Sequence, residues 1–263
     1  MFCANCGSEN RDDARFCLSC GSELNAAAIP AGPDHALRYT IFGQTLPAVS
    51  IKLNSGESIY TQSGGLAWKD TGISMETNMK GGFMQGLGRM FSGESLFMAT
   101  YTSNRPDQEI VIASTFPGSI AVVEVGRQPL IAQKSAFLCA QPGVRLSAYI
   151  TKGLKAGLFG GEGFVLQRVS GQGLVFLEID GSLVERELAA GETIQVDTGK
   201  VAAFEERVQY QAEMVRGFRN ILFGGEGLFL TTLTGPGRVW LQTMEIASFA
   251  RQLIPFLPRS GSD

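Results

Sequence analysis

Apolar and polar residues alternate over short stretches for most of the chain, and glycine-containing turns separate these stretches. Residues 135–139 (SAFLC) and 201–205 (VAAFE) are examples, and residues 235–237 (GPG) form one of the turns. An alternation with a period of two predicts short β-strands, and Gly and Pro between them predict tight turns. Residues 243–257 instead space their apolar positions as a helix does, up to Pro255, and they predict a C-terminal helix that caps the β body.

The strand pattern repeats along the chain. Three glycine-rich segments match one another, with starts 68 and 64 residues apart, and further matches lie upstream and downstream of each. We therefore predict three copies of one β unit of about 65–70 residues. Arranged about a pseudo-threefold axis, the units would bury one another's apolar faces and strand edges. The matching blocks begin at Gly56, Gly126 and Gly191, at Phe91, Phe159 and Phe223, and at Gly118, Gly173 and Gly237.

The first 24 residues hold a different pattern, two C-x2-C pairs with ten residues between them. Each pair of thiolates can occupy one edge of a tetrahedron, and two pairs complete the coordination of one metal ion. Because four thiolates leave no position for water or substrate, the spacing predicts a structural zinc ribbon and not a catalytic site. Iron in the same cage is the competing metal. The ligands are Cys3, Cys6, Cys17 and Cys20.

Composition agrees with a packed globular protein, since 44% of the residues are apolar and 18% are charged. The formal net charge is −3 and no run of Lys and Arg occurs, so we do not expect nucleic acid as a partner. The N-terminus has no secretory signal pattern, and no apolar run approaches the roughly 18–20 residues that span a bilayer. We expect a cytoplasmic protein.

These patterns divide the chain into four parts. Residues 1–24 form the ribbon, and residues 25–38, rich in Ala, Pro and Gly, form a flexible linker with the single histidine, His35. Residues 39–257 form the triple-repeat β domain, and residues 258–263 form a tail.

The repeats, the FGGEG-type turns and the Gly- and Met-rich segment 79–91 resemble the family of the fungal altered-inheritance-of-mitochondria protein twenty-four. The resemblance covers roughly residues 39–257. It implies an all-β fold of three short double-stranded β-helix repeats, like those of the tryptophan RNA-binding attenuation protein. It supplies no catalytic residues.

Two sets of residues in the repeats are candidates for a function. The first is one carboxylate per repeat, which would form a cation-binding ring if the axis brought the three together; the alternative is that each accepts backbone hydrogen bonds within its turn. The second is an apolar loop per repeat, flanked by cations, which suits a docking surface unless its side chains fold back into the core. The carboxylates are Glu94, Glu162 and Glu226, and the loop residues are Phe83, Met84, Leu87, Met90, Leu154, Leu158, Phe218 and Leu222.

With its only histidine in the linker, the body offers no Cys–His or Ser–His pair, and Cys139 is expected to be a small buried residue. We therefore expect no enzyme, but a scaffold or adaptor protein with the ribbon and the loop face as docking sites for a protein partner. A homo-oligomer and a membrane surface stay open as further partners. The alternative is a small-ligand-binding protein with clefts between the β repeats.

Overall fold

The computed structural model describes residue 8 and residues 37–62, 64–77, 98–149, 165–214 and 229–256. These residues form nineteen strands, three short 3-10 turns and one helix, so the predicted all-β class with a C-terminal helix is confirmed. After the first strand, the strands form three consecutive units of six strands each. Unit 1 spans residues 48–113, unit 2 spans residues 118–180 and unit 3 spans residues 183–242. The strands are β1 (Arg38–Phe42); β2 (Ala48–Leu53), β3 (Ser58–Gln62), β4 (Leu66–Lys69), β5 (Ile73–Thr77), β6 (Met98–Ser103) and β7 (Gln108–Ala113) of unit 1; β8 (Gly118–Val125), β9 (Leu130–Gln133), β10 (Phe137–Ala140), β11 (Val144–Ala148), β12 (Leu166–Gly171) and β13 (Gly173–Asp180) of unit 2; and β14 (Leu183–Leu188), β15 (Thr193–Asp197), β16 (Val201–Glu205), β17 (Gln209–Met214), β18 (Phe229–Thr234) and β19 (Gly237–Gln242) of unit 3. The turns are η1 (Lys134–Ala136), η2 (Thr198–Lys200) and η3 (Ile254–Phe256), and the helix is α1 (Ile246–Leu253).

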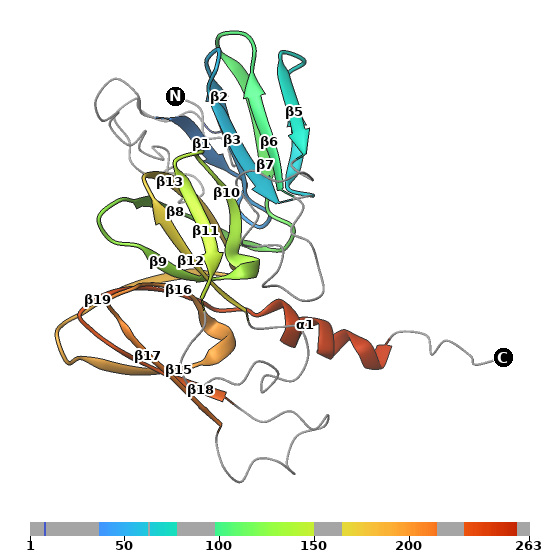
Figure 1. Ribbon diagram of the computed structural model, residues 1–263. Coiled ribbons are helices and arrows are strands. Elements are labelled where there is room, and N and C mark those ends of the chain that lie inside the picture. Colours follow the sequence, from blue (N-terminus) through green and yellow to red (C-terminus); the bar gives the residue numbers. More distant parts are fainter. Residues whose placement is uncertain are drawn as a thin grey trace.

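The same antiparallel pairings occur in all three units. In each unit the sixth strand lies between the first and the third, and the fifth strand lies between the second and the fourth. The third strand carries an irregularity in register at the same place each time, between its first and third residues. A β-bulge repeated in this way marks the units as copies of one design. Figure 1 shows the units stacked in chain order, with unit 2 between the other two.

Neighbouring units are joined by strand pairing. The second strand of one unit pairs with the third strand of the next, as β3 pairs with β10 and β9 pairs with β16. Each junction merges half of one unit with half of the next into a six-stranded sheet, in the orders β5-β6-β3-β10-β13-β8 and β11-β12-β9-β16-β19-β14. We call these two pairings the internal junctions.

The junction strands are buried on both faces. The four residues of β10 and the five residues of β16 are all buried, so the alternation that we predicted for 135–139 and 201–205 is wrong there. The reason is that each junction strand lies between two cores: Phe137 and Ala140 contribute to the core of unit 2, whereas Leu138 and Cys139 contribute to the core of unit 1. Strands covered on both faces contain near-continuous apolar residues.

A third junction, which a closed threefold arrangement would contain, is not among the pairings of the described strands. Its two strands, β4 of unit 1 and β15 of unit 3, are each the outermost strand of a sheet. In Figure 1, β7, the partner of β4, lies near the top of the molecule and β15 lies near the bottom. The described units therefore form an open stack, with one junction strand at each end, β4 or β15, that has no partner unit among the described strands.

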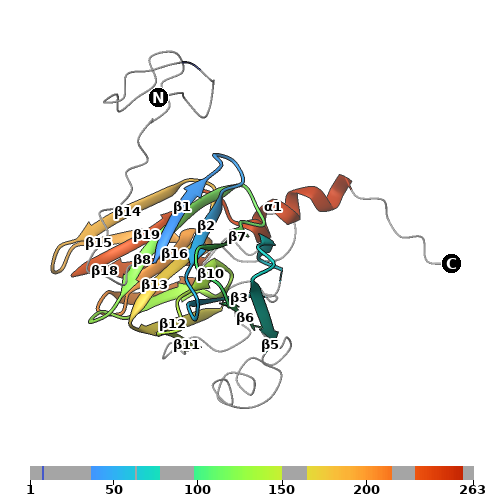
Figure 2. The same ribbon diagram turned by 90° about the horizontal axis from the view of Figure 1, so that it is seen from above.

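Two details of the sequence prediction need correction. The block at Gly118 is β8, the first strand of unit 2, whereas the blocks at Gly173 and Gly237 are the sixth strands β13 and β19; their counterpart in unit 1 is β7. The C-terminal helix exists, but none of its residues is buried, so it does not cap the β body. It extends away from the sheets in both views (Figures 1 and 2).

Candidate functional site

The four ribbon cysteines lie outside the described residues. Their fit to a metal therefore rests on the donor set: two C-x2-C pairs supply four thiolates, the ligand set of structural zinc sites. Such a site holds its segment folded and supplies no open coordination position for chemistry. Elsewhere in the described part of the chain, no group of three or more His, Cys, Asp or Glu side chains could hold a metal ion.

The three candidate loops join equivalent strands. They connect β5 to β6, β11 to β12 and β17 to β18, and in each case the two strands form an antiparallel hairpin. The described strands on either side of the three loops thus occupy corresponding positions in the three units. The eight loop residues and the three carboxylates predicted as sites lie in segments 78–97, 150–164 and 215–228, outside the described residues: Phe83, Met84, Leu87, Met90, Leu154, Leu158, Phe218, Leu222, Glu94, Glu162 and Glu226.

Each internal junction is crossed by a glutamine side chain that sequence reasoning missed. The last residue of β3, Gln62, donates from Nε2 to the carbonyl oxygens of Lys134 and Phe137 at 3.2 and 3.3 Å. The last residue of β9, Gln133, donates in the same way to Gly199 and Val201 at 3.4 and 2.7 Å. Both glutamines reach the 3-10 turn that precedes the paired strand of the next unit. The sequence did contain a signal for this contact, because Gln62 and Gln133 occupy equivalent positions in units 1 and 2.

The equivalent position in unit 3 holds Asp197, which cannot make this contact. A carboxylate has no N–H to donate to a carbonyl oxygen. Its Oδ1 instead accepts from the backbone N–H of Gly199 in its own unit at 3.0 Å, at the start of η2. The junction glutamine is therefore present only where a following unit exists.

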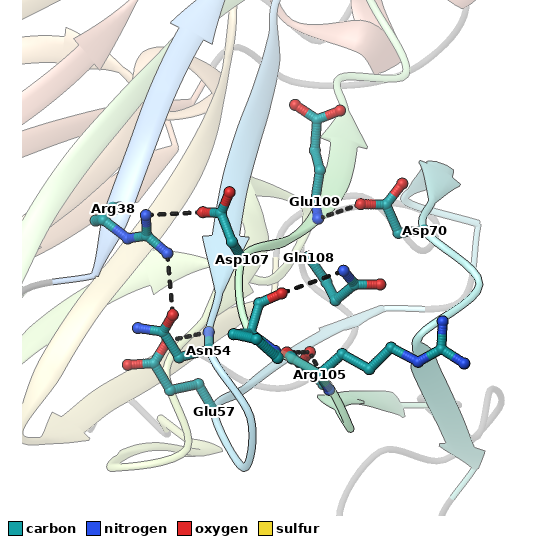
Figure 3. Close-up of polar contacts among 10 residues, drawn as sticks. Arg38, Asn54, Glu57, Asp70, Arg105, Asp107, Gln108 and Glu109 are labelled. Atoms are coloured by element: carbon teal, nitrogen blue, oxygen red, sulfur yellow. Dashed lines mark hydrogen bonds and ion pairs between the residues drawn. The ribbon is translucent and has the colours of Figure 1, made fainter.

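A second side-chain contact repeats in all three units, and Figure 3 shows its unit 1 form. The residue after the third strand, or at its end, accepts a hydrogen bond from the backbone N–H near the start of the sixth strand. Asp70 accepts from Glu109 at 2.8 Å, Gln141 from Leu174 at 2.8 Å, and Glu205 from Arg238 at 3.3 Å. Asp, Gln and Glu each make this contact in one unit. Among the described residues, the repeated feature is therefore a side-chain oxygen that accepts this hydrogen bond, and not a carboxylate.

Two partly buried acidic groups make structural contacts. Glu178 Oε1 accepts from the backbone N–H groups of Thr115 and Phe116 at 2.6 and 3.2 Å, and burial raises the pKa of this carboxyl. Asp180 Oδ2 accepts from the N–H of Ile246 at the start of α1 at 2.9 Å, and burial also raises its pKa. Each of these carboxylates thus holds a neighbouring segment in place, a turn for Glu178 and the start of α1 for Asp180.

The described cysteine is shielded from reagents. Cys139 is fully buried in β10, and burial raises the pKa of its thiol. Because the thiolate is the nucleophilic form, this environment opposes nucleophilic chemistry. The expectation of a small buried residue is confirmed.

Several of the exposed apolar side chains lie on β1 and β4 or on the C-terminal helix. At the unit 1 end, Trp68 of β4 lies 6.2 Å from Phe42 of β1 between ring centres, and the two side chains are about half exposed. At the C-terminal end, Phe249, Leu253 and Phe256 are exposed on α1 and η3. Within the described ranges, no helix has the length and apolar character needed to cross a membrane.

The sequence matches two protein-family models. Residues 39–244 match the family model described as "Mitochondrial biogenesis AIM24", and residues 2–24 match that of a zinc-ribbon domain. The chain belongs to the AIM24 family. The family suggested by the repeats and turns is therefore confirmed, and so is the ribbon at the N-terminus.

Two relatives of this AIM24-family chain come from Streptococcus pyogenes. An uncharacterised protein of serotype M6 is 29% identical over 238 residues, which cover 87% of this chain and 94% of that protein. An X-ray crystal structure of a protein of the same species, from a structural genomics consortium, is 27% identical, with a TM-score of 0.68. That likeness covers 84% of this chain and all of the other.

Proposed function

We propose that this AIM24-family chain is a non-enzymatic scaffold or adaptor, in which the zinc ribbon recruits a protein partner and the β body holds it in an assembly. The family description refers to mitochondrial biogenesis. For this chain, we limit the proposal to the adaptor role and leave the process open.

The observation that carries the proposal is the occupation of the unit junctions. Side chains from neighbouring units interlock there: Met98 of unit 1 and Trp240 of unit 3 both pack into the core of unit 2. A glutamine crosses each junction. With both internal junctions filled, nothing among the described residues favours the alternative of small-ligand clefts between the repeats.

The ribbon supplies the second part of the argument. A four-thiolate zinc site stabilises a short segment that cannot bury enough apolar surface to fold alone. The β body has hydrophobic cores of its own and does not need the ribbon for them. A folded ribbon is therefore best explained as a binding surface for a partner. A zinc site with four protein ligands has no open position for catalysis, but it can stabilise a docking surface.

The test compares the full chain with its C17S/C20S variant, in which two of the four ligands are lost. Wild type is expected to carry one zinc ion per chain and to retain a protein partner from native lysate. The variant should lose both the zinc and the partner. Both tryptophans lie in the body, so the thermal transition followed by tryptophan fluorescence should stay in place.

Two results would contradict the proposal. If the variant retained the same partner at the same amount, the ribbon would not be the recruiting part. If the tryptophan transition collapsed with the zinc, the ribbon would be part of the body's stability instead of an independent docking point.

A further inference from the structure

Two unpaired strand edges, one in unit 1 and one in unit 3, belong to the counterparts of the strands that pair at the internal junctions. There, the last residue but one of the second strand lies opposite the third residue of the third strand, as Thr61 lies opposite Cys139 and Ala132 opposite Ala203. The free second strand is β15 and the free third strand is β4. Applied to these strands, the register places Val196 opposite Trp68.

This register would bring apolar side chains together on the inner face. At the internal junctions the corresponding residues are buried, with exposures of 0 or 1%. Trp68 in contrast is 53% exposed, and Val196 is only partly buried against the core of unit 3. Pairing would remove the Trp68 ring from water and set it against Val196. An exposed apolar strand edge is a ready template for another strand.

On the opposite face, the same register brings opposite charges together. The next pair at the internal junctions is Ala140 with Tyr60 and Phe204 with Ile131, so Lys69 would lie opposite Gln195. Asp197 lies two residues further along β15 and is therefore the diagonal neighbour of Lys69 on that face. Long side chains reach diagonal neighbours across antiparallel strands, and opposite charges there are favourable. The two edges are complementary on both faces.

In the described structure, β4 and β15 of one molecule do not pair with each other, and Figure 1 shows unit 2 between units 1 and 3. We propose that β15 of one copy pairs with β4 of a second copy, in the register of the internal junctions, so that molecules join head to tail. Each copy uses two different surfaces, so the contact is heterologous and builds either a ring or an open filament. This inference goes beyond the adaptor function and does not depend on it.

The junction between copies is weaker than the internal ones. Asp197 replaces the glutamine that crosses each internal junction, and no covalent connection holds the two strands close together. Association should therefore depend on protein concentration, and it should weaken with salt because of the Lys69–Asp197 pair.

The first test is sedimentation velocity of the full chain over a wide concentration range. Wild type should show growing oligomers. W68K and V196K each place a charge on one of the two edges, so each alone should stay monomeric. An equimolar mixture of W68K and V196K should give a 1:1 heterodimer and nothing larger, because one intact β4 edge and one intact β15 edge remain between them.

The second test is a charge exchange. K69D and D197K should each weaken association by roughly fivefold to tenfold, because attraction becomes repulsion across the edge. The double variant K69D/D197K should recover it, since each copy supplies both edges. R145E changes the net charge by as much as K69D, but on the exposed side of β11, and it should leave association unchanged.

Several results would overturn the proposal. The proposal would be contradicted directly if the wild-type protein stayed monomeric at every concentration. Association that W68K and V196K leave intact would place the contact elsewhere, for example on α1. A mixture of these two variants that remains monomeric, or a charge-exchanged double variant that is no better than the single variants, would exclude this register. Circular dichroism of each variant checks that the β fold is intact.

Discussion

The internal junctions and the outer edges of this protein use the same two strands of the repeated unit, but with different side chains. Inside, a glutamine crosses the junction and small residues such as Cys139 and Ala203 meet their neighbours at 0% exposure. Outside, the equivalent positions hold Asp197 and Trp68, and Trp68 is half exposed. The repeat therefore specifies the unit, whereas a few residues at each edge decide whether that edge is closed within the chain.

The largest expected difference between the two regions concerns buried aromatic volume. Phe204 of β16 is fully buried at an internal junction and stacks on Tyr210 with ring centres 5.3 Å apart. F204A should lower the free energy of unfolding by about 3–5 kcal/mol, because it removes apolar contacts and leaves a cavity. In dilute monomer, W68A should change it by less than about 1 kcal/mol. Urea unfolding followed by circular dichroism measures both, and equal costs would contradict the comparison.

The glutamines should show the next largest effect. Q133A leaves the buried carbonyl oxygen of Val201 without its donor, so it should cost about 1–3 kcal/mol in unfolding free energy. Q62A should cost less, because Gln62 is less buried than Gln133. D197N, at the same place in unit 3, should stay within about 0.5 kcal/mol, since its side-chain oxygen can still accept from Gly199. A D197N cost as large as that of Q133A would mean that the third position is also part of a closed junction.

An ion pair gives a smaller effect across the second internal junction. Arg168 of unit 2 contacts Glu206 of unit 3 through two hydrogen bonds of 2.6 and 2.9 Å, and about a third of each side chain is exposed. A double-mutant cycle with R168A and E206A should give a coupling of about 0.2–1 kcal/mol that decreases with salt. Because Arg168 lowers the pKa of Glu206, the coupling should be lost as the pH falls and that carboxyl takes up its proton. A coupling of zero at low salt would show that the Arg168–Glu206 ion pair does not stabilise the junction.

The smallest prediction concerns pH. Burial raises the pKa of Glu178 above its ordinary value of 4.5, so the folded state favours the protonated form. Its contribution to stability is full below the ordinary pKa and is lost as the pH rises through the folded pKa. E178Q keeps an oxygen for the N–H groups of Thr115 and Phe116 but cannot ionise. The unfolding free energy of wild type minus that of E178Q should fall as the pH is raised from 4 to 8, and a rising difference would contradict the assignment.

Much of this architecture could be predicted from the sequence, because its signals are local. The two C-x2-C pairs identify the ribbon, and Gly-containing turns between short apolar runs identify the strands. Glycine at Gly56 and Gly191, which have φ of 85° and 78°, marks the same turn in two units. The matching blocks at these turns were placed correctly, because the backbone itself requires glycine there.

What could not be predicted depends on partners that are distant in sequence. Strand β10 is buried on both faces because it lies between the cores of units 1 and 2. Its pairing with β3 joins residues nearly 80 positions apart. The block at Gly118 was assigned to the wrong strand because β8 and β13 share the same apolar, Gly-initiated pattern. Residues such as Gln62 and Gln133 resemble ordinary polar strand ends until the next unit is placed beside them.

Hydrogen exchange of the backbone amides in dilute, monomeric protein tests the central claim most directly, namely that two junctions are closed within the chain and the third is open. The account predicts slow exchange in β10 and β16, which pair on both sides. It predicts exchange several orders of magnitude faster at the outward-facing amides of β4 and β15. Equal protection of β4 and β15 in the monomer would show that the three units close into a ring within one chain, and would contradict both the open stack and the head-to-tail contact built on it.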